Sequence, residues 1–484
     1  MVVTAKSAAG QYLERLKDRN TVYVNGVKVD VRTEPAFMGA IACIGRYYDL
    51  QDEKPDVHCF KDEEGLNAPV SLLVPAAEED LRKKAKSYKE VADLSYGMLG
   101  RTPDFINAAL ATLYAHSKLL GENAYTDFSA NMRAYYRFVK TNNLFVGHGA
   151  INPQIDRSLS LGSQTNHYAG VKVVAHDKDG ITVTGAKMIV TLAPIADELL
   201  IFNMPGLKPG DEDYAVSFAL PVDYPGVKII CRKPLVKSSY HAFDHPLANS
   251  FDEIDAYLIL DDVFIPWNKV FVFKDVAKSN LFYDKTFARN HTGHQGIVRG
   301  LSKAELLTGI AVKLAGMLKL DGFVNIQEKL GEMTSYVELL RASILLSEAD
   351  STVSHEGVQT PSINAIQAIR YNFPKMYEKM VKTIQSLAAG SMLSTPHYED
   401  FLAEELGGLA VSLSTGETDA ATRSKLLNLA WDASGDGFGQ RQLVYEFFHA
   451  GDPMRIAAGH YLHYDKSGML SMVDRVLARA NKAD

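Results

Sequence analysis

The sequence has few cysteines, no long apolar run and no strong excess of one charge. Its 484 residues include three cysteines, too few and too scattered for a disulfide framework or a paired-cysteine metal site. No stretch of about 18 apolar residues occurs, and the first twenty residues lack the apolar core of an export signal. We therefore expect a cytoplasmic protein without a membrane segment.

The charge balance argues against a nucleic-acid partner. The formal net charge is -7, and the Lys and Arg residues are spread along the chain rather than gathered in a basic run. The hydrophobic share of 46% and the charged share of 23% are those of a globular protein. The length exceeds what one ordinary core needs, so we expect two or three domains.

A change of hydrophobic period divides the chain into three blocks. Residues 1–145 read as mainly helical, interrupted by a hairpin at Asn25-Gly26, and residues 146–275 read as short strands, two of them around Asp179-Gly180. Residues 276–484 return to long amphipathic stretches that suggest a bundle of four helices. No flexible linker separates the blocks, so we expect them to pack as one unit.

Two short motifs contain candidate site residues. In "GMLGRTPDF" we expect Thr102 to cap the helix that Pro103 opens, with Arg101 just before it, as either a solvated charge or a site residue. In "GHGAINPQIDR" His148 stands between two glycines in an expected loop. Its imidazole suits a base near neutral pKa or a hydrogen-bond donor, and a structural histidine in a turn is the alternative.

Other motifs are weaker. His291 and His294 stand three residues apart, but no neighbouring carboxylate or cysteine completes a familiar ligand set, so we expect no metal there. The stretch "SGDGFGQRQ" lacks the context of a dinucleotide or phosphate loop. In "HAGDPMR" Arg455 suits a phosphate, although a plain interhelical turn explains the motif almost as well.

The order of six motifs resembles one family. The motifs are "YGMLGRTPDF", "HGAINPQIDR", "GITVTGAKMIVT", "FDHPLANSFDEIDAYLILDDVFIPW", "NHTGHQ" and "FGQRQLVYEFFHAGDPMR". Together they resemble the 4-hydroxyphenylacetate 3-monooxygenase family, the oxygenase components of two-component flavin monooxygenases. The resemblance implies a mainly helical α+β fold like that of acyl-CoA dehydrogenases: an N-terminal helical domain (1–145), a central β-barrel (146–275) and a C-terminal four-helix bundle (276–484). It also implies a homotetramer, arranged as a dimer of dimers.

The resemblance also implies an activity, the hydroxylation of a small phenol in aromatic compound catabolism. Reduced FAD, supplied by a separate NAD(P)H:flavin reductase, would react with O₂ to give a C4a-hydroperoxide that transfers one oxygen atom to the ring. In this reading His148 removes the phenol proton and Arg101 stabilises the oxyanion, and both bind substrate together with Phe105. The FAD contacts implied are His148, Gly149, Ala150, Gln154, Ile155, Asp156, Arg157, Thr191, Asp452, Pro453, Met454 and Arg455.

The sequence departs from the family pattern at Phe105, where phenylacetate hydroxylases usually have a tyrosine, which leaves the ring substrate open. A second enzyme reading is a cluster-free FAD-dependent dehydratase or isomerase of CoA esters, related to 4-hydroxybutyryl-CoA dehydratase. Of the positions that match that enzyme's iron–sulfur ligands, Tyr96, Gly100, His291 and Val298, only the histidine is retained. A non-catalytic flavin-binding protein is the third reading.

Overall fold

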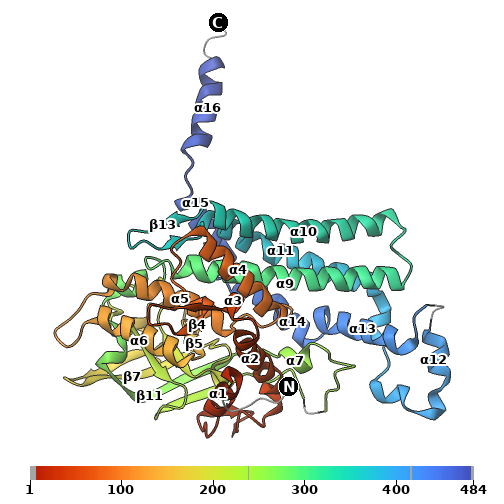
Figure 1. Cartoon of the computed structure of the whole chain (residues 1–484), viewed down its shortest axis with the longest axis horizontal. Coiled ribbons are helices and arrows are strands. Elements are labelled where there is room, and N and C mark those ends of the chain that lie inside the picture. Colours follow the sequence, from red (N-terminus) through yellow and green to blue (C-terminus); the bar gives the residue numbers. More distant parts are fainter. Residues whose placement is uncertain (1–6, 238, 415–416, 481–484) are drawn as a thin grey trace.

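Two β-sheets lie to one side of the long C-terminal helices, at the lower left of Figure 1. The computed structural model describes residues 7–237, 239–414 and 417–480. One sheet has six strands in the order β2-β1-β10-β11-β7-β6, and the other has four in the order β12-β9-β8-β5. Their bounds are β1 (Val22–Val24), β2 (Val27–Lys28), β5 (Val146–Gly149), β6 (Lys172–His176), β7 (Gly180–Lys187), β8 (Glu198–Ile201), β9 (Val216–Pro221), β10 (Val227–Cys231), β11 (Ala256–Pro266) and β12 (Val270–Phe273).

The two hairpins expected from the sequence are confirmed. Asn25 and Gly26 have φ angles of 51° and 80°, the positive values that a two-residue turn between β1 and β2 needs. The turn before Gly180 joins the antiparallel strands β6 and β7. Strand β1 also pairs in parallel with β10, so a strand of the first sequence block belongs to the sheet of the second. The domain limits given above stay a prediction.

The first third of the chain supplies helices that pack on the sheets and on the C-terminal bundle. They are α1 (Ala8–Arg15), α2 (Pro35–Glu53), α3 (Pro55–His58), α4 (Glu78–Asp93), α5 (Pro103–Ala115) and α6 (Phe128–Asn142), with a small hairpin of β3 (Cys59–Lys61) and β4 (Asn67–Pro69). Helix α5 begins with Pro103 at its first turn, where a missing N–H costs nothing. It contacts strand β5 on one side and the C-terminal helices on the other, so it lies where sheet and bundle meet.

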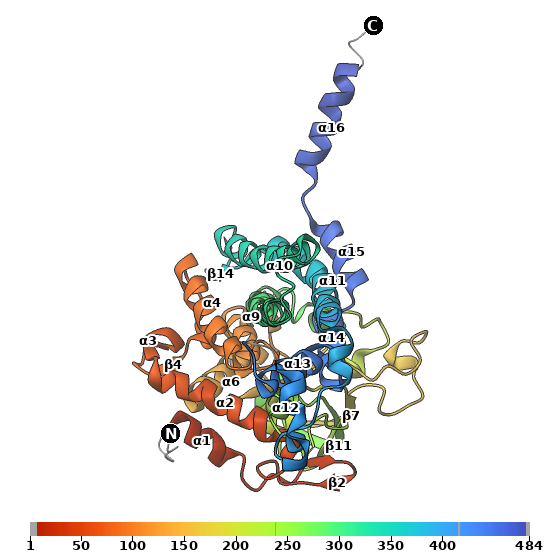
Figure 2. The same cartoon turned by 90° about the vertical axis from the view of Figure 1, so that its right-hand side faces the viewer.

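The last two hundred residues form the expected bundle. Its long helices are α9 (Ala288–Met317), α10 (Val324–Ala349), α11 (Ile363–Ala388) and α13 (Ala420–Ser434), and its shorter elements are β13 (Thr352–Val353), β14 (Gln359–Thr360), α12 (Gly408–Leu413), α14 (Gly437–Phe448), α15 (Pro453–His463) and α16 (Ser467–Ala480). Two short helices precede it, α7 (Ala248–Phe251) and α8 (Val276–Leu281). Both views show α16 projecting away from the body (Figures 1 and 2).

The hydrophobic core joins the three blocks. A large cluster combines the first helices with both sheets and includes Phe105 and Ile106 of α5. A second cluster fills the bundle and includes Tyr88 and Ala108, which come from α4 and α5. The expectation that the blocks pack as one unit is therefore confirmed. In the part of the chain that the structure describes, no helix combines the length and apolarity needed to cross a bilayer.

A buried ion triad fastens α14 to α9. Arg299 donates to both carboxylate oxygens of Glu446 at 2.6 and 2.9 Å, and Lys303 Nζ lies 2.7 Å from Glu446 Oε1. All three side chains are almost completely buried. Burial lowers the pKa of Lys303 to about 8, with Glu446 opposing that shift. Because the carboxylate compensates two buried cations, the packing of α14 depends on it.

Replacing Glu446 by glutamine is expected to lower the free energy of unfolding by about 3–5 kcal/mol, because two buried cations lose their counter-charge. Urea denaturation measures the loss. Glu338→Gln is the matched control, since this exposed glutamate pairs with Arg341 at the surface, and its effect should stay within about 0.5 kcal/mol. Equal effects in the two variants would contradict the role given to the triad.

Candidate active site

Arg101, Phe105 and His148 meet at the junction of sheet and bundle. The guanidinium carbon of Arg101 lies 4.1 Å from the centre of the Phe105 ring. The Phe105 and His148 rings have centroids 5.4 Å apart, and Phe202 lies on another side of the imidazole at 6.2 Å. Arg101 precedes α5, Phe105 lies in its first turn and His148 belongs to β5. The two candidate catalytic side chains therefore both contact the Phe105 ring.

Helix α14 and a buried glutamate hold Arg101 in place. Its Nη1 donates to the Tyr445 hydroxyl at 2.7 Å, and its Nη2 donates to the backbone carbonyl of His449 at 3.2 Å. The backbone N–H of Arg101 donates to Glu253 Oε1 at 2.8 Å. Thr102 does not cap α5 as expected, because its hydroxyl donates to Asp104 instead. Arg101 is thus not a solvated surface charge.

Two guanidinium groups at this junction have no carboxylate partner among the described residues. Arg101 binds only hydroxyl and carbonyl oxygens, and Arg370 donates to the carbonyl of Ala450 at 2.8 Å and to the amide of Gln367 at 3.3 Å. Burial, then the nearby Arg289, lowers the pKa of Arg370 to about 10, and Arg101 contributes to the shift. Positive charge that the protein leaves uncompensated favours an anionic ligand.

The imidazole of His148 is neutral in this environment. Burial lowers its pKa to about 3, and the charge of Arg101 acts in the same direction. The sequence-based expectation of a pKa near neutral is therefore wrong for the protein without ligand. A neutral ring keeps a lone pair that accepts a hydrogen bond. An anion placed beside both groups would raise the pKa of His148, because its negative charge attracts the protonated imidazole.

Thr191 belongs to a polar chain that reaches the same helix. Its hydroxyl donates to Asp255 Oδ1 at 2.8 Å, and Asp255 pairs with Arg441 of α14 at 3.0 Å. Burial opposes ionisation of Asp255, but Arg441 and Arg232 outweigh it and keep the pKa of the carboxyl below its usual value. With its proton committed to Asp255, the Thr191 oxygen can only accept a further hydrogen bond.

Models of two families cover the chain. The description "4-hydroxyphenylacetate 3-hydroxylase N terminal" matches residues 8–272, and "4-hydroxyphenylacetate 3-hydroxylase C terminal" matches residues 279–478. The chain belongs to the 4-hydroxyphenylacetate 3-hydroxylase family. The resemblance drawn from the six motifs is confirmed.

Relatives agree in sequence and in structure. The 4-hydroxyphenylacetate 3-monooxygenase oxygenase component of Thermus thermophilus is 35% identical over 94% of each chain. A crystal structure of the oxygenase component (HpaB) complexed with FAD and 4-hydroxyphenylacetate has a TM-score of 0.93 and 34% identity, over 98% of this chain and 99% of that one. An archaeal 4-hydroxybutyryl-CoA dehydratase from N. maritimus has a TM-score of 0.88 but 22% identity, covering 98% and 95% of the two chains, which supports a shared fold only.

The start of the "GHGAINPQIDR" segment has a different conformation from the loop that we expected. His148 and Gly149 lie in strand β5, which pairs in parallel with β8, and not in a loop. A Cβ at Gly147 or Gly149 would come within 3.0 or 2.9 Å of the side chains of Leu199 and Ile201. The glycines therefore make room for the side chains of β8, which is a packing role.

Several residues that the family resemblance implies as FAD contacts lie at the surface. Ala150 and Thr191 are buried, but Gln154, Ile155, Asp156 and Arg157 are exposed in the loop after β5. Asp452 caps α15 by accepting from the N–H of Met454 at 2.8 Å, and Met454 is 73% exposed. Pro453 opens that helix and Arg455 is exposed on it. Within the described residues, no hydrogen bond, ion pair or ring contact joins either group to Arg101 or His148.

The sequence reading missed most of the residues that hold Arg101. Arg441, Tyr445 and His449 are spaced four residues apart, so they share one face of α14, with His449 directly after its last residue. This spacing is visible in the sequence once the helix limits are known. Glu253, Asp255 and Arg370 carry no comparable signal. His291 and His294 are buried in α9, where His294 pairs with Glu348 at 3.0 Å and burial holds the pKa of His291 well below its usual value.

In the protein without ligand, the His148 imidazole is expected to stay uncharged from pH 5 to 8, because its lowered pKa means that it gains a proton only near pH 3. Histidine ¹⁵N NMR measures this, and the signal is assigned by its loss in His148→Gln and its retention in His355→Gln. A titration midpoint for that signal between pH 5 and 8 would show that the guanidinium and burial do not act as inferred.

Proposed function

We propose that this protein is a reduced-FAD-dependent hydroxylase of phenols, the oxygenase component of a two-component monooxygenase. The observation that carries the proposal is the uncompensated guanidinium of Arg101, stacked on Phe105 and beside the neutral imidazole of His148. Family membership supports the reaction class. The substrate is a small phenol of the 4-hydroxyphenylacetate type, the compound bound by the HpaB relative.

The polar groups at the junction fit a reduced flavin. Reduced FAD, when bound, supplies the electrons that activate O₂ for transfer of one oxygen atom to the ring. Thr191 offers a hydrogen-bond acceptor, which suits an N–H of a reduced isoalloxazine, because its own proton is donated to Asp255. Arg101 and Arg370 offer positive charge to an anionic group. The exposed loop of residues 154–157 and the start of α15 are proposed as further contacts to FAD.

Arg101 and His148 activate the substrate. A phenol with pKa ~10 costs roughly 4 kcal/mol to ionise at neutral pH. The guanidinium of Arg101 lowers this cost by stabilising the phenolate, and His148 accepts the phenol hydrogen bond and then its proton. Burial and the charge of Arg101 keep the pKa of His148 low, and the negative charge of the phenolate formed beside the ring favours the protonated imidazole against both. Phe105 contacts the ring face.

The dehydratase reading has weaker support. The likeness to 4-hydroxybutyryl-CoA dehydratase is one of fold only. A Cβ at Gly100 would overlap the hydroxyl of Tyr445, which itself binds Arg101. A cysteine ligand at this position would displace the residue that holds the guanidinium, so the geometry disfavours an iron–sulfur cluster here. Family membership favours the hydroxylase over a cluster-free dehydratase.

The proposal includes the partners and the assembly. A separate NAD(P)H:flavin reductase supplies the reduced FAD in the cytoplasm, and the free, buried state of Cys43, Cys59 and Cys231 is compatible with that location.

The chain forms a homotetramer. Helix α16 supports this part, because it projects from the body (Figure 2) and its sequence places exposed apolar side chains in a stripe. The stripe consists of Met469, Leu470, Met472, Val473, Val476 and Leu477.

Purified protein supplied with chemically reduced FAD, ¹⁸O₂ and a panel of phenols is expected to give a catechol that carries one labelled oxygen atom. Mass spectrometry of the products measures this. A crotonyl product from 4-hydroxybutyryl-CoA without oxygen uptake would favour the dehydratase instead. FAD binding with no product from either substrate class would favour the non-catalytic reading.

His148→Ala is expected to lower the hydroxylation rate by about 10²-fold or more, the usual scale for losing a proton acceptor, while FAD still binds. Product formation and oxygen uptake are measured together, so that uncoupled oxygen consumption is visible. The control is His355→Ala, which removes an exposed histidine outside the site and should leave the rate unchanged. Unchanged coupling in His148→Ala would remove this residue from the mechanism.

A further inference from the structure

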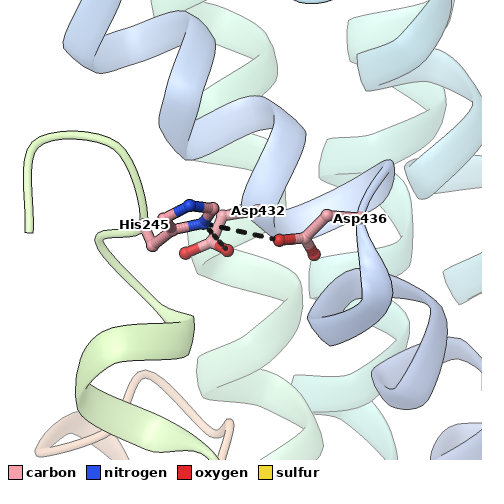
Figure 3. Close-up of side chains that lie close together, drawn as sticks. All are labelled: His245, Asp432 and Asp436. Atoms are coloured by element: carbon pink, nitrogen blue, oxygen red, sulfur yellow. Dashed lines mark ion pairs between the residues drawn. The ribbon is translucent and has the colours of Figure 1, made fainter. Parts of the chain in front are cut away.

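Three side chains of types that can ligate a metal, none of them a candidate active-site residue, lie close together. Figure 3 shows His245, on the loop before α7, pointing at Asp432 on α13 and Asp436 at the start of α14. His245 Nδ1 lies 3.9 Å from Asp432 Oδ1 and 3.8 Å from Asp436 Oδ2. The three atoms all lie within 4.8 Å of one another. They come from two segments nearly two hundred residues apart in sequence, so tertiary packing brings them together.

Each carboxylate is oriented by backbone N–H groups through one oxygen. Asp432 Oδ2 accepts from Leu247 and Ala248 at 2.5 and 2.8 Å. Asp436 Oδ1 caps α14 by accepting from Phe438 and Gly439 at 2.8 and 3.0 Å. The other oxygen of each carboxylate is the one that faces the imidazole. The orientation of both potential ligands is thus fixed by the fold.

The atoms that face one another lack hydrogen bonds. Asp432 is completely buried, and its Oδ1 has no hydrogen-bond partner, nor does His245 Nδ1. Separations of 3.8 and 3.9 Å are too long for N–H···O bonds. A buried carboxylate oxygen without a partner is costly and calls for a ligand. In tetrahedral coordination with bonds of about 2.1 Å, ligand atoms stand about 3.4 Å apart, so a small closure would suffice.

We propose that His245 Nδ1, Asp432 Oδ1 and Asp436 Oδ2 bind a divalent transition-metal ion of the zinc or manganese type, with water completing the coordination. One imidazole with two carboxylates suits these ions better than Ca²⁺, which prefers oxygen ligands alone. Tyr240 stacks on the His245 ring at 3.7 Å and holds its plane. The imidazole and Asp436 remain partly exposed, which gives the ion a path of entry.

The competing account is an imidazolium held between two carboxylates. The two facing carboxylates, Asp432 and Asp436, raise the pKa of His245 to about 9, so the ion must displace a proton at neutral pH. The separations of 3.9 and 3.8 Å are those of two ion pairs without a hydrogen bond, so titration with metal distinguishes the two accounts.

The ion would have a structural role. It would tie the loop before α7 to the start of α14, five positions before Arg441, and Arg441 and Tyr445 of that helix hold the segment around Arg101. None of the three metal-ligating residues belongs to the proposed hydroxylase site, so metal binding and hydroxylation can be tested independently.

Isothermal titration of the full-length, EDTA-treated and desalted protein with ZnCl₂, and separately with MnCl₂, tests the proposal. About one equivalent is expected to bind per chain, with a rise in the thermal unfolding midpoint, since an ion that binds only the folded state stabilises it. His245→Gln and Asp436→Asn should each weaken binding at least about tenfold. Asparagine still caps a helix, so Asp436→Asn is expected to fold.

The matched control is His355→Gln, an exposed histidine beside Glu356, which should bind the metal as the unchanged protein does. Absence of saturable binding, or equal affinity in all variants, would overturn the proposal in favour of the imidazolium. If both ligand variants fail to fold, X-ray absorption of the zinc-loaded protein decides: one imidazole with oxygen ligands supports the site, and a sulfur ligand or a second imidazole refutes it.

Discussion

The carboxylate of Glu253 connects the two sides of the candidate active site. Its Oε1 accepts the backbone N–H groups of Gly100 and Arg101 at 2.6 and 2.8 Å, and its Oε2 pairs with Arg441 at 2.9 Å. Because the side chain is completely buried, the carboxylate is stable only with all these partners in place. The start of α5, the segment before β11 and helix α14 are thereby fixed relative to one another, and with them the position of the Arg101 guanidinium.

The distribution of counter-charges separates the arginines that maintain the fold from those that can bind a ligand. Arg299 and Arg441 are neutralised by buried carboxylates, whereas Arg101 and Arg370 bind only neutral oxygens among the described residues. A buried cation without a counter-charge lowers stability, and local features that cost stability are concentrated at functional sites. The same charge lowers the pKa of His148. The arrangement therefore keeps the imidazole neutral until an anion arrives.

Local patterns in the sequence predict most of the fold. Asn25-Gly26 and the turn before Gly180 mark hairpins because their backbone angles require such residues. Strand β5 escapes this reading, since two of its four residues are glycines with poor strand propensity. It is a strand because β8 lies beside it and fills the space that the glycines leave. Tertiary packing, which no local pattern records, decides its conformation and hence the direction of His148.

The candidate site is predictable only in part for the same reason. Arg101, Phe105 and His148 follow from motifs, and the structure brings them together. The residues around them do not follow from motifs. Glu253 and Arg370 belong to no recognisable sequence pattern, and their contacts form only when the segments around them pack together. The Asp432 and Asp436 pair is visible as a spacing of four, yet the loop that supplies His245 is nearly two hundred residues away. The three side chains come together only because that loop packs on α13 and α14, and no local sequence pattern records this packing.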